Sequence, residues 1–310
     1  MSDEKLRLED LLDDVKAAPE QDRIEYVAII GCGRMGQGIA WTVAASGLDV
    51  VIIEKDQFHL EKGQQQLEAQ MEREIARWAM TKSEMKSILS KIQWKTDFNE
   101  LKDCDVIIEA VEENFQLKRL LFKKCDEICK PEAIFISNTS TLSLTKIAEI
   151  TDRKDRIIGM HFLHPVQKVP LVELIKALDT SDATVETIKG FATTIGKTAV
   201  EVYEYPGFVT TRAIVPLLNE AMHILLEGIA SAQDIDIAMK LGYNFPMGPL
   251  EMADTMGLDE VLAWMETLWN TLGEPRYRPC PLLRKLVRER KLGKKTGEGF
   301  YKYDQDDKIV

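Results

Sequence analysis

The residues best suited to chemistry are a histidine and a glutamate on two successive apolar segments, His161 in IIGMHF and Glu173 in VPLVELI. A carboxylate inside an apolar strand is costly to bury without a partner, and His161, at the end of the preceding segment, is the candidate. If the two strands are neighbours, Glu173 can fix the tautomer of His161 and stabilise its protonated form, as a general base requires. The alternative is an ordinary core histidine.

Polar side chains follow another predicted strand, at residues 133–136. The run from Ser137 to Thr141 (SNTST) carries hydroxyls and an amide at the carboxyl end of that strand. Such groups suit a polar atom of a substrate or cofactor. Ser140 or Thr141 could equally cap the helix that follows, since hydroxyl residues favour N-cap positions. The sequence leaves both interpretations open.

A glycine-rich turn, GCGRMG, follows the apolar residues 27–30 and precedes a helical pattern. Gly31 allows a tight turn, Gly33 lets the backbone approach a pyrophosphate, and Gly36 lets the helix pack on the strand. The free N–H groups at the start of the helix attract phosphates. The residues expected to border a dinucleotide here are Gly31, Gly33, Arg34, Met35 and Gly36. The alternative is a turn with a purely structural role.

The second predicted strand, residues 49–53, ends in Glu54. An acidic side chain at this point can bond both ribose hydroxyls of NAD and repel the additional phosphate of NADP. Lys55 is adjacent and could instead serve that phosphate. The sequence favours NAD as the cofactor.

The composition is that of an ordinary globular protein, with 310 residues, 45 % hydrophobic and 29 % charged. A net charge of −11 argues against nucleic acid or an anionic membrane as partner, and no apolar run is long enough to span a bilayer. Five cysteines without zinc spacing suggest reduced thiols and a cytoplasmic protein. His161 and His164, three apart on an extended strand, point their rings apart, so no metal site is predicted.

The predicted fold is α/β: a Rossmann-type doubly wound sheet over residues 25–204, which ends in an antiparallel pair of strands, followed by an all-α domain over residues 205–310. A charged helical hairpin is inserted at residues 58–91 with a break near 80–83. Residues 1–24 form either an amphipathic helix that docks or a solubilising extension. The apolar surplus of the C-terminal helices suggests a homodimer. The tail 293–303 is either a closing turn or a phosphate-contacting loop.

These motifs together resemble the 3-hydroxyacyl-CoA dehydrogenase family, in particular its bacterial 3-hydroxybutyryl-CoA members. The resemblance covers about residues 24–303. The segments that carry it are GCGRMG, CDVIIEA with EEN, SNTSTLS, GMHFLHPV, PLVELI, PGFVTTR, DIAMKLG, PMGPLE and GKKTGEGFY.

The resemblance implies reversible hydride transfer between NAD and C3 of an L-3-hydroxyacyl-CoA. His161 matches the general base of the family, Glu173 its carboxylate partner, and Ser140 the serine that bonds the substrate oxygen. The residues that match cofactor-contacting positions are Glu113, Lys118, Ser140 and Lys295. Within the hairpin, which by composition alone is a solvated face, Arg73 and Arg77 would contact the phosphates of coenzyme A.

Two positions depart from the family pattern. His164 and Thr211 stand where the family has asparagines, beside the reacting end of the acyl group. With a hairpin poor in lysine, they favour a second hypothesis, a dehydrogenase of a free 3-hydroxy acid such as a sugar acid or a carnitine-like compound. A third is a cofactor-binding relative without catalysis, against which His161, Glu173 and Ser140 argue.

Overall fold

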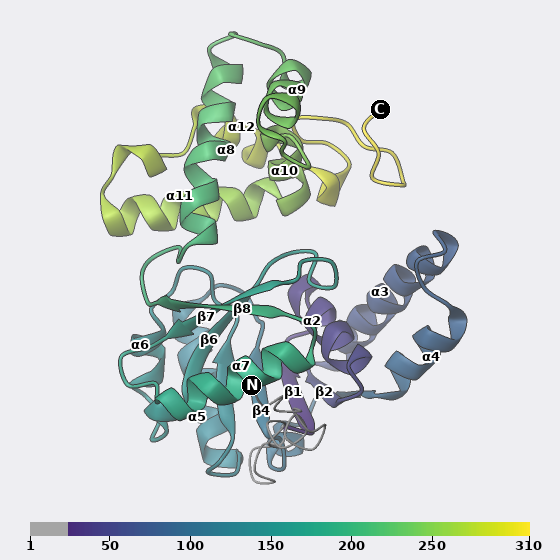
Figure 1. Cartoon of the computed structure of the whole chain (residues 1–310), viewed down its shortest axis with the longest axis vertical. Helices are drawn as coiled ribbons and strands as arrows, with labels where there is room; N and C mark the ends of the chain where they lie inside the picture. The colour runs from purple at the N-terminus through teal and green to yellow at the C-terminus, as the bar shows by residue number, and fades with distance from the viewer. Residues whose placement is uncertain (1–23) are drawn as a thin grey trace, which may run out of the picture.

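A computed structural model describes residues 24–310, which form an α/β domain and a helical domain (Figure 1). The eight strands of the described sheet are β1 (Tyr26–Ile30), β2 (Asp49–Ile53), β3 (Ile92–Lys95), β4 (Val106–Glu109), β5 (Ile134–Ser137), β6 (Ile157–Phe162), β7 (Leu171–Lys176) and β8 (Thr198–Tyr203). Their order is β3-β2-β1-β4-β5-β6-β7-β8. All neighbouring pairs are parallel except β6 with β7.

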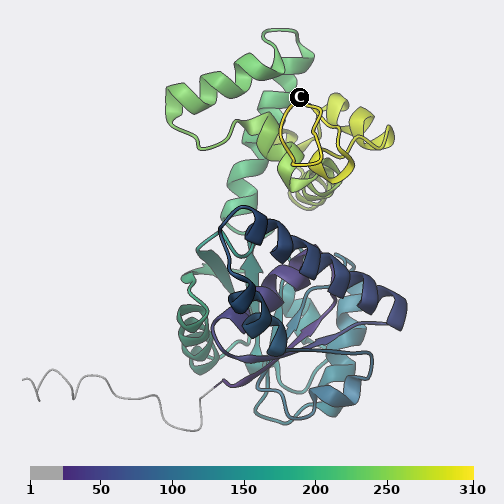
Figure 2. The ribbon, with the colours of Figure 1, turned by 90° about the vertical axis from the view of Figure 1, so that its right-hand side faces the viewer.

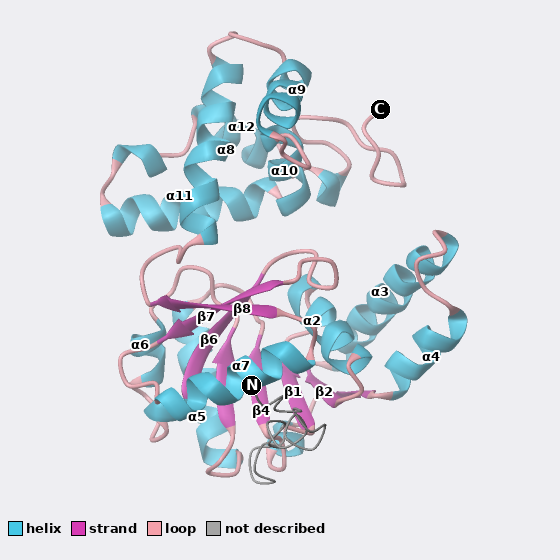
Figure 3. Cartoon of the chain, viewed as in Figure 1, coloured by secondary structure: helices cyan, strands magenta, loops and turns pink. Residues whose placement is uncertain are grey.

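Helices cover both faces of the sheet (Figure 3). Those of the α/β domain are α2 (Arg34–Ala45), α3 (Gln57–Ala76), α4 (Lys82–Ser90), α5 (Phe115–Ile128), α6 (Leu144–Ala148) and α7 (Asp182–Thr194). Successive residues of β1 enter opposite cores, Val27 and Ile29 on one face and Ala28 and Ile30 on the other. A strand buried on both faces needs a continuous apolar run, which is why residues 27–30 are all apolar.

The helical domain consists of α8 (Thr210–Leu226), α9 (Ala232–Tyr243), α10 (Pro249–Met256), α11 (Leu258–Leu272) and α12 (Pro281–Arg288). It lies at one end of the molecule and is joined to the α/β domain where α8 begins (Figure 2). The tail closes on this domain: the buried Asp254 carboxylate accepts hydrogen bonds from the backbone of Phe300 and Tyr301 and from the hydroxyl of Tyr303. Of the two interpretations of the tail, this packing favours the closing turn.

The predicted fold class is confirmed, with two corrections. The sheet was predicted to end with an antiparallel pair, which is β6 and β7, but α7 and β8 follow, and β8 runs parallel to β7. The strand β8 is an edge strand with mostly exposed side chains, so its sequence, TAVEVY, lacks a long apolar run. The hairpin breaks at residues 77–81, just before the capping box of Thr81 and Glu84 that starts α4, rather than at 80–83. The helix predicted for residues 1–24 lies outside the described residues except for Ile24.

Two further features concern the described part of the chain. All five cysteines are buried and unpaired, as the sequence suggested. Between residues 24 and 310, no helix combines the length and the apolar character needed to cross a membrane.

The glycine-rich turn links β1 to α2. Gly31 has φ of +100°, a conformation that favours glycine. A Cβ atom on Gly36 would lie 1.9 Å from the carbonyl oxygen of Gly31, so α2 packs this closely only because Gly36 has no side chain. Beside Gly33, by contrast, no atom lies within 4 Å of the Cβ position, so the backbone there is open to a ligand.

Replacement of Gly36 by alanine should therefore destabilise the protein by about 1–3 kcal/mol and weaken NADH binding, because the backbone of Gly31 must move. The matched control is Gly190→Ala in α7, where a Cβ meets no atom within 4 Å. That change should stabilise the protein by roughly 0.5–1 kcal/mol. Urea denaturation followed by fluorescence measures the change in stability of each variant. Equal denaturation midpoints for the two variants would contradict this account.

Candidate active site

His161 and Glu173 face each other across the antiparallel pair β6 and β7, in direct register. The Nδ1 atom of His161 lies 2.7 Å from Oε2 of Glu173. The two residues are 5 % and 1 % exposed. The antiparallel reversal between β6 and β7 thus supplies the neighbour that a buried carboxylate needs.

The Glu173 carboxylate also accepts hydrogen bonds from the residues at the start of α8. Its Oε1 accepts hydrogen bonds from the backbone N–H groups of Val209 (3.0 Å) and Thr210 (2.9 Å), and Oε2 accepts one from the Thr210 hydroxyl (2.8 Å). Burial alone would raise the pKa of Glu173, but the hydrogen bonds from His161 and Thr210 hold it below its usual value. The group is therefore an anion near neutral pH.

An anionic Glu173 assigns the tautomer of His161. Nδ1 carries the proton and donates a hydrogen bond to the carboxylate, so the free lone pair of the ring is on Nε2. Within residues 24–310, Nε2 makes no hydrogen bond. The ring of Phe208 packs 5.8 Å from the imidazole, centroid to centroid. His161 is thus oriented on one side and able to accept a proton on the other.

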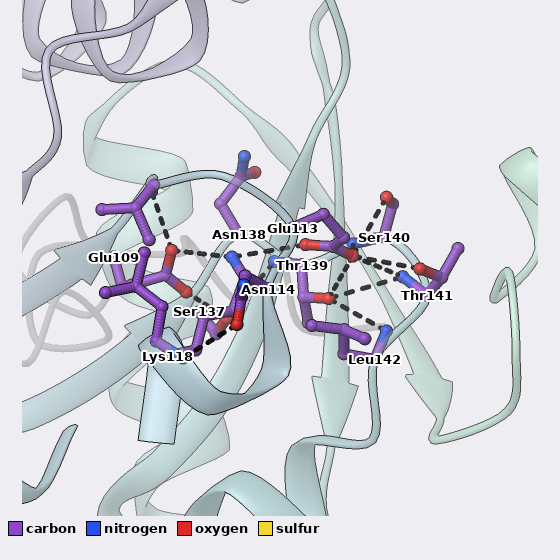
Figure 4. Close-up of polar contacts among 12 residues, drawn as sticks. Glu109, Glu113, Asn114, Lys118, Ser137, Asn138, Thr139, Ser140, Thr141 and Leu142 are labelled. Atoms are coloured by element: carbon purple, nitrogen blue, oxygen red, sulfur yellow. Dashed lines mark hydrogen bonds and ion pairs between the residues drawn. The ribbon is translucent and has the colours of Figure 1, made fainter. Parts of the chain in front are cut away.

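Glu113 organises the loop that carries Ser140 (Figure 4). Its Oε1 accepts hydrogen bonds from the hydroxyl of Thr139 (2.6 Å), the backbone of Ser140 (3.0 Å), and both the backbone and the hydroxyl of Thr141 (3.1 Å each). Burial would raise the pKa of Glu113, but nearby Lys118 and these hydrogen bonds lower it. The capping alternative for Ser140 and Thr141 is wrong, because Ser143 is the N-cap of α6.

Lys118 lies beneath this loop and is 1 % exposed. Its ammonium is 2.7 Å from Oε1 of Glu109 and 3.3 Å from Oε2 of Glu113. The other oxygen of Glu109 accepts a hydrogen bond from Ser137 (2.7 Å). Lys118 was expected to contact the cofactor, but in this structure its ammonium forms ion pairs with these two carboxylates. Glu109 was not predicted as a site residue, although a glutamate at the end of the apolar run DVIIE carries the same signal as Glu173.

A cleft of about 600 Å³ opens between α2, α3 and the loop after β6. The basic and histidine side chains that line it are Arg34, Arg73, Arg77, His164 and Lys168. His164 is exposed to the cleft, but the protein around it and the nearby Arg34 lower its pKa to about 4. The ring is therefore neutral at pH 7. Both arginines of the hairpin, Arg73 and Arg77, therefore lie at the cleft, since they are among its lining residues. Thr211 is buried on the first turn of α8.

Two predicted cofactor residues engage acids of the helical domain. The Arg34 guanidinium donates to the carbonyl of Met256 at 3.1 Å and pairs with the carboxylate of Glu260, so it bridges the two domains. Lys295 pairs with Asp259 at 2.6 Å. Neighbouring acids at the start of α11 thus hold both cations at the domain boundary.

The turn and the end of β2 have the features needed to hold a dinucleotide. Glu54 accepts a hydrogen bond from the backbone of Cys32 (3.0 Å), so its carboxylate lies against the glycine-rich turn. Gly33 caps α2 without a side-chain hydrogen bond, which leaves the first N–H groups of the helix available to phosphates. Burial and Glu54 raise the pKa of Cys32 to about 12, so it remains a thiol. No group of three or more His, Cys, Asp or Glu residues between 24 and 310 is arranged to hold a metal ion.

Comparison with known proteins agrees with this geometry. Residues 26–205 match the model of the 3-hydroxyacyl-CoA dehydrogenase NAD-binding domain, and residues 207–303 match that of the C-terminal domain. The chain is 43 % identical over 279 residues to 3-hydroxybutyryl-CoA dehydrogenase of Clostridioides difficile, covering 90 % of this chain and 99 % of the relative. It is 40 % identical over 289 residues to the mitochondrial hydroxyacyl-coenzyme A dehydrogenase of Homo sapiens, covering 90 % and 91 %.

Among solved structures, the (S)-3-hydroxybutyryl-CoA dehydrogenase PaaH1 of Ralstonia eutropha is similar, with a TM-score of 0.82 and 42 % identity. The match covers 91 % of this chain and all of that one. The similarity therefore extends over both domains.

Glu173→Gln should lower the stability by about 1.5–3 kcal/mol at pH 7, because the amide cannot replace a carboxylate that accepts four hydrogen bonds. The folded state lowers the pKa of Glu173, so its contribution is present above the unfolded pKa of about 4.5 and lost as the pH falls through the folded pKa. The difference from wild type, measured by urea denaturation, should therefore narrow below about pH 4.5. Glu201→Gln, on the exposed edge strand, is the control and should change the free energy of unfolding little. A stability difference between Glu173→Gln and wild type that stays constant with pH would argue against the assignment.

Proposed function

Because the chain belongs to the 3-hydroxyacyl-CoA dehydrogenase family, an NAD-dependent oxidoreductase family, we propose that it interconverts short-chain L-3-hydroxyacyl-CoA and 3-oxoacyl-CoA. The relatives named for 3-hydroxybutyryl-CoA support a four-carbon acyl group. The single observation that carries the proposal is the buried pair of His161 and Glu173, with Nε2 of the histidine able to accept a proton.

His161 acts as the general base. Its Nε2 takes the proton of the C3 hydroxyl, and the Glu173 carboxylate stabilises the imidazolium that results. The NAD cofactor, when bound, supplies the acceptor for the hydride that leaves C3. Ser140, held by Glu113, and His164 donate hydrogen bonds to the substrate oxygen as its bond to carbon gains double-bond character. Thr211 borders the same end of the acyl group.

The cofactor site that we propose follows the glycine-rich turn. Gly31, Gly33, Met35 and Gly36 bring the backbone to the pyrophosphate, and Glu54 binds the ribose hydroxyls. Glu113 and Lys295 complete the cofactor contacts. Lys118 acts here through Glu113, since two carboxylates already surround its ammonium.

The cleft distinguishes a coenzyme A thioester from a free 3-hydroxy acid. Arg73 and Arg77 line the cleft rather than facing bulk solvent alone, so their positive charges are available to the phosphates of coenzyme A. A free 3-hydroxy acid has no phosphate groups that these two arginines could bind. This favours the thioester, with the two arginines as phosphate contacts.

We also propose that the protein is a cytoplasmic homodimer. Ile229, Leu241 and Tyr243, on and beside α9, are exposed apolar side chains. An apolar hollow of about 260 Å³ also lies between α8 and α9, where Ile224 and Met239 are among its lining residues. A second copy of the chain would cover this surface.

His161→Gln should lower kcat for acetoacetyl-CoA reduction by roughly 10²–10⁴-fold, the usual contribution of a general acid or base. NADH binding, measured by fluorescence, should stay near the wild-type value, because the cofactor contacts are intact. His223→Gln, in the last turn of α8, is the matched control and should keep full activity. Substantial turnover by His161→Gln would remove His161 from its proposed role.

The substrate class is tested by NADH oxidation with acetoacetyl-CoA and free acetoacetate at equal concentrations. Rapid oxidation is expected with the thioester alone. The double variant Arg73→Gln/Arg77→Gln should raise KM for acetoacetyl-CoA about tenfold with little change in kcat, while Lys86→Gln on α4 should change neither. Activity with acetoacetate alone would instead support a dehydrogenase of free hydroxy acids.

A further inference from the structure

The loop between β6 and β7 forms one wall of the cleft. Residues 164–168 all line it, and among them are the side chains of His164 and Lys168. The loop is tightly turned, since the carbonyl of Pro165 accepts hydrogen bonds from the backbone of both Lys168 and Val169 at 3.0 Å. The position of this turn therefore decides where three polar side chains, those of His164, Gln167 and Lys168, enter the cleft.

A buried lysine holds the turn from behind. The ammonium of Lys197, just before β8, donates hydrogen bonds to the carbonyl oxygens of Val166 and of Val169, the latter at 2.7 Å. Lys197 is only 5 % exposed, and burial lowers its pKa. The chain next to it is tied to the same loop, because Thr198 donates its N–H to the carbonyl of Pro170 at 2.7 Å.

Among residues 24–310, Lys197 has no counter-ion. In the part of the chain that the structure describes, no carboxylate lies within 4.0 Å of its ammonium, whereas the buried Lys118 has two. A buried cation without an anion costs free energy, and an apolar side chain could fill the same volume. What an apolar side chain could not supply is a set of N–H donors that gathers two carbonyl groups at one point.

The opposite side of the loop is fixed by α2. Val166 is buried against Gly38, where a Cβ atom would lie 2.9 Å from its Cγ2 atom. The turn is thus held between the ammonium of Lys197 on one side and a helix surface without a side chain on the other. Its two carbonyls point to the ammonium, and the side chains of His164 and Lys168 border the cleft.

We propose that Lys197 is a positioning residue for acyl-CoA binding. Through the carbonyls of Val166 and Val169 it sets the wall of the cleft that meets the coenzyme A portion of the substrate, without touching the substrate itself. This inference rests on the proposed acyl-CoA substrate. It assigns Lys197 no contact with NAD, whose proposed site is the glycine-rich turn that precedes α2.

The test replaces Lys197 by methionine, whose unbranched side chain is one atom shorter and has no N–H donors. Calorimetry with coenzyme A and with NADH, each alone, measures the two sites separately. Kinetics compare acetoacetyl-CoA with S-acetoacetyl-N-acetylcysteamine, a thioester without the nucleotide. We expect Kd for coenzyme A and KM for acetoacetyl-CoA to rise about tenfold, while Kd for NADH stays within about twofold. Because His164 lies on the same loop, kcat/KM for the truncated thioester should also fall, but by less than kcat/KM for acetoacetyl-CoA.

Lys197→Arg, which retains N–H donors, should recover most of the coenzyme A affinity. Lys189→Met is the matched control, because that lysine of α7 is paired at the surface with Glu186 and Glu201. If Lys197→Met does not fold, Gly38→Ala decides the matter, since it moves Val166 from the opposite side and should give the same selective loss.

The outcomes separate this inference from the proposed function. Wild-type protein that neither binds coenzyme A nor reduces acetoacetyl-CoA would overturn both. Wild-type protein that does so, with a folded Lys197→Met variant of equal coenzyme A affinity, would overturn only the role of Lys197. An equal loss of NADH and coenzyme A affinity would also overturn it, because that is the sign of general destabilisation.

Discussion

The carboxylate of Glu173 is the point on which the two domains and the proposed catalytic base all depend. It accepts a hydrogen bond from His161, on the strand beside it, and three from the first residues of α8. A helix N-terminus favours a negative charge, so the start of the helical domain stabilises the anion that orients the histidine. One group therefore couples the geometry of the base to the attachment of the second domain.

At the neighbouring strand ends too, single buried charges hold loops in place. Glu113 gathers the N–H and hydroxyl groups of the loop around Ser140, and Lys118 and Glu109 support it from below. Lys197 does the same for the next loop with carbonyl groups as partners. In both loops a charged side chain thus pairs with backbone groups that would otherwise need another hydrogen-bond partner. The cleft is lined by polar groups whose positions are fixed from behind.

Much of the fold could be predicted because its signals are local. The apolar run before GCGRMG and the helical character of residues 205–310 each depend on neighbouring residues, and the structure contains both. The strand β8 was missed because an edge strand is mostly exposed and its sequence need not be apolar. Arg34 was expected at the cofactor, yet its guanidinium reaches Met256 and Glu260, more than 200 residues away in sequence.

By itself, the sequence determined that this protein has a dinucleotide-type turn, that Glu173 needs a partner, and that His161 is the available one. These conclusions follow from burial and steric rules that act within short segments. Only the tertiary structure decided that α8 completes the shell of Glu173, that Lys118 is enclosed by Glu109 and Glu113, and that Lys197 holds a loop about 30 residues before it. The reason is physical: these contacts join segments distant in sequence, and the packing of the sheet, with its one antiparallel reversal at β7, sets which of them meet.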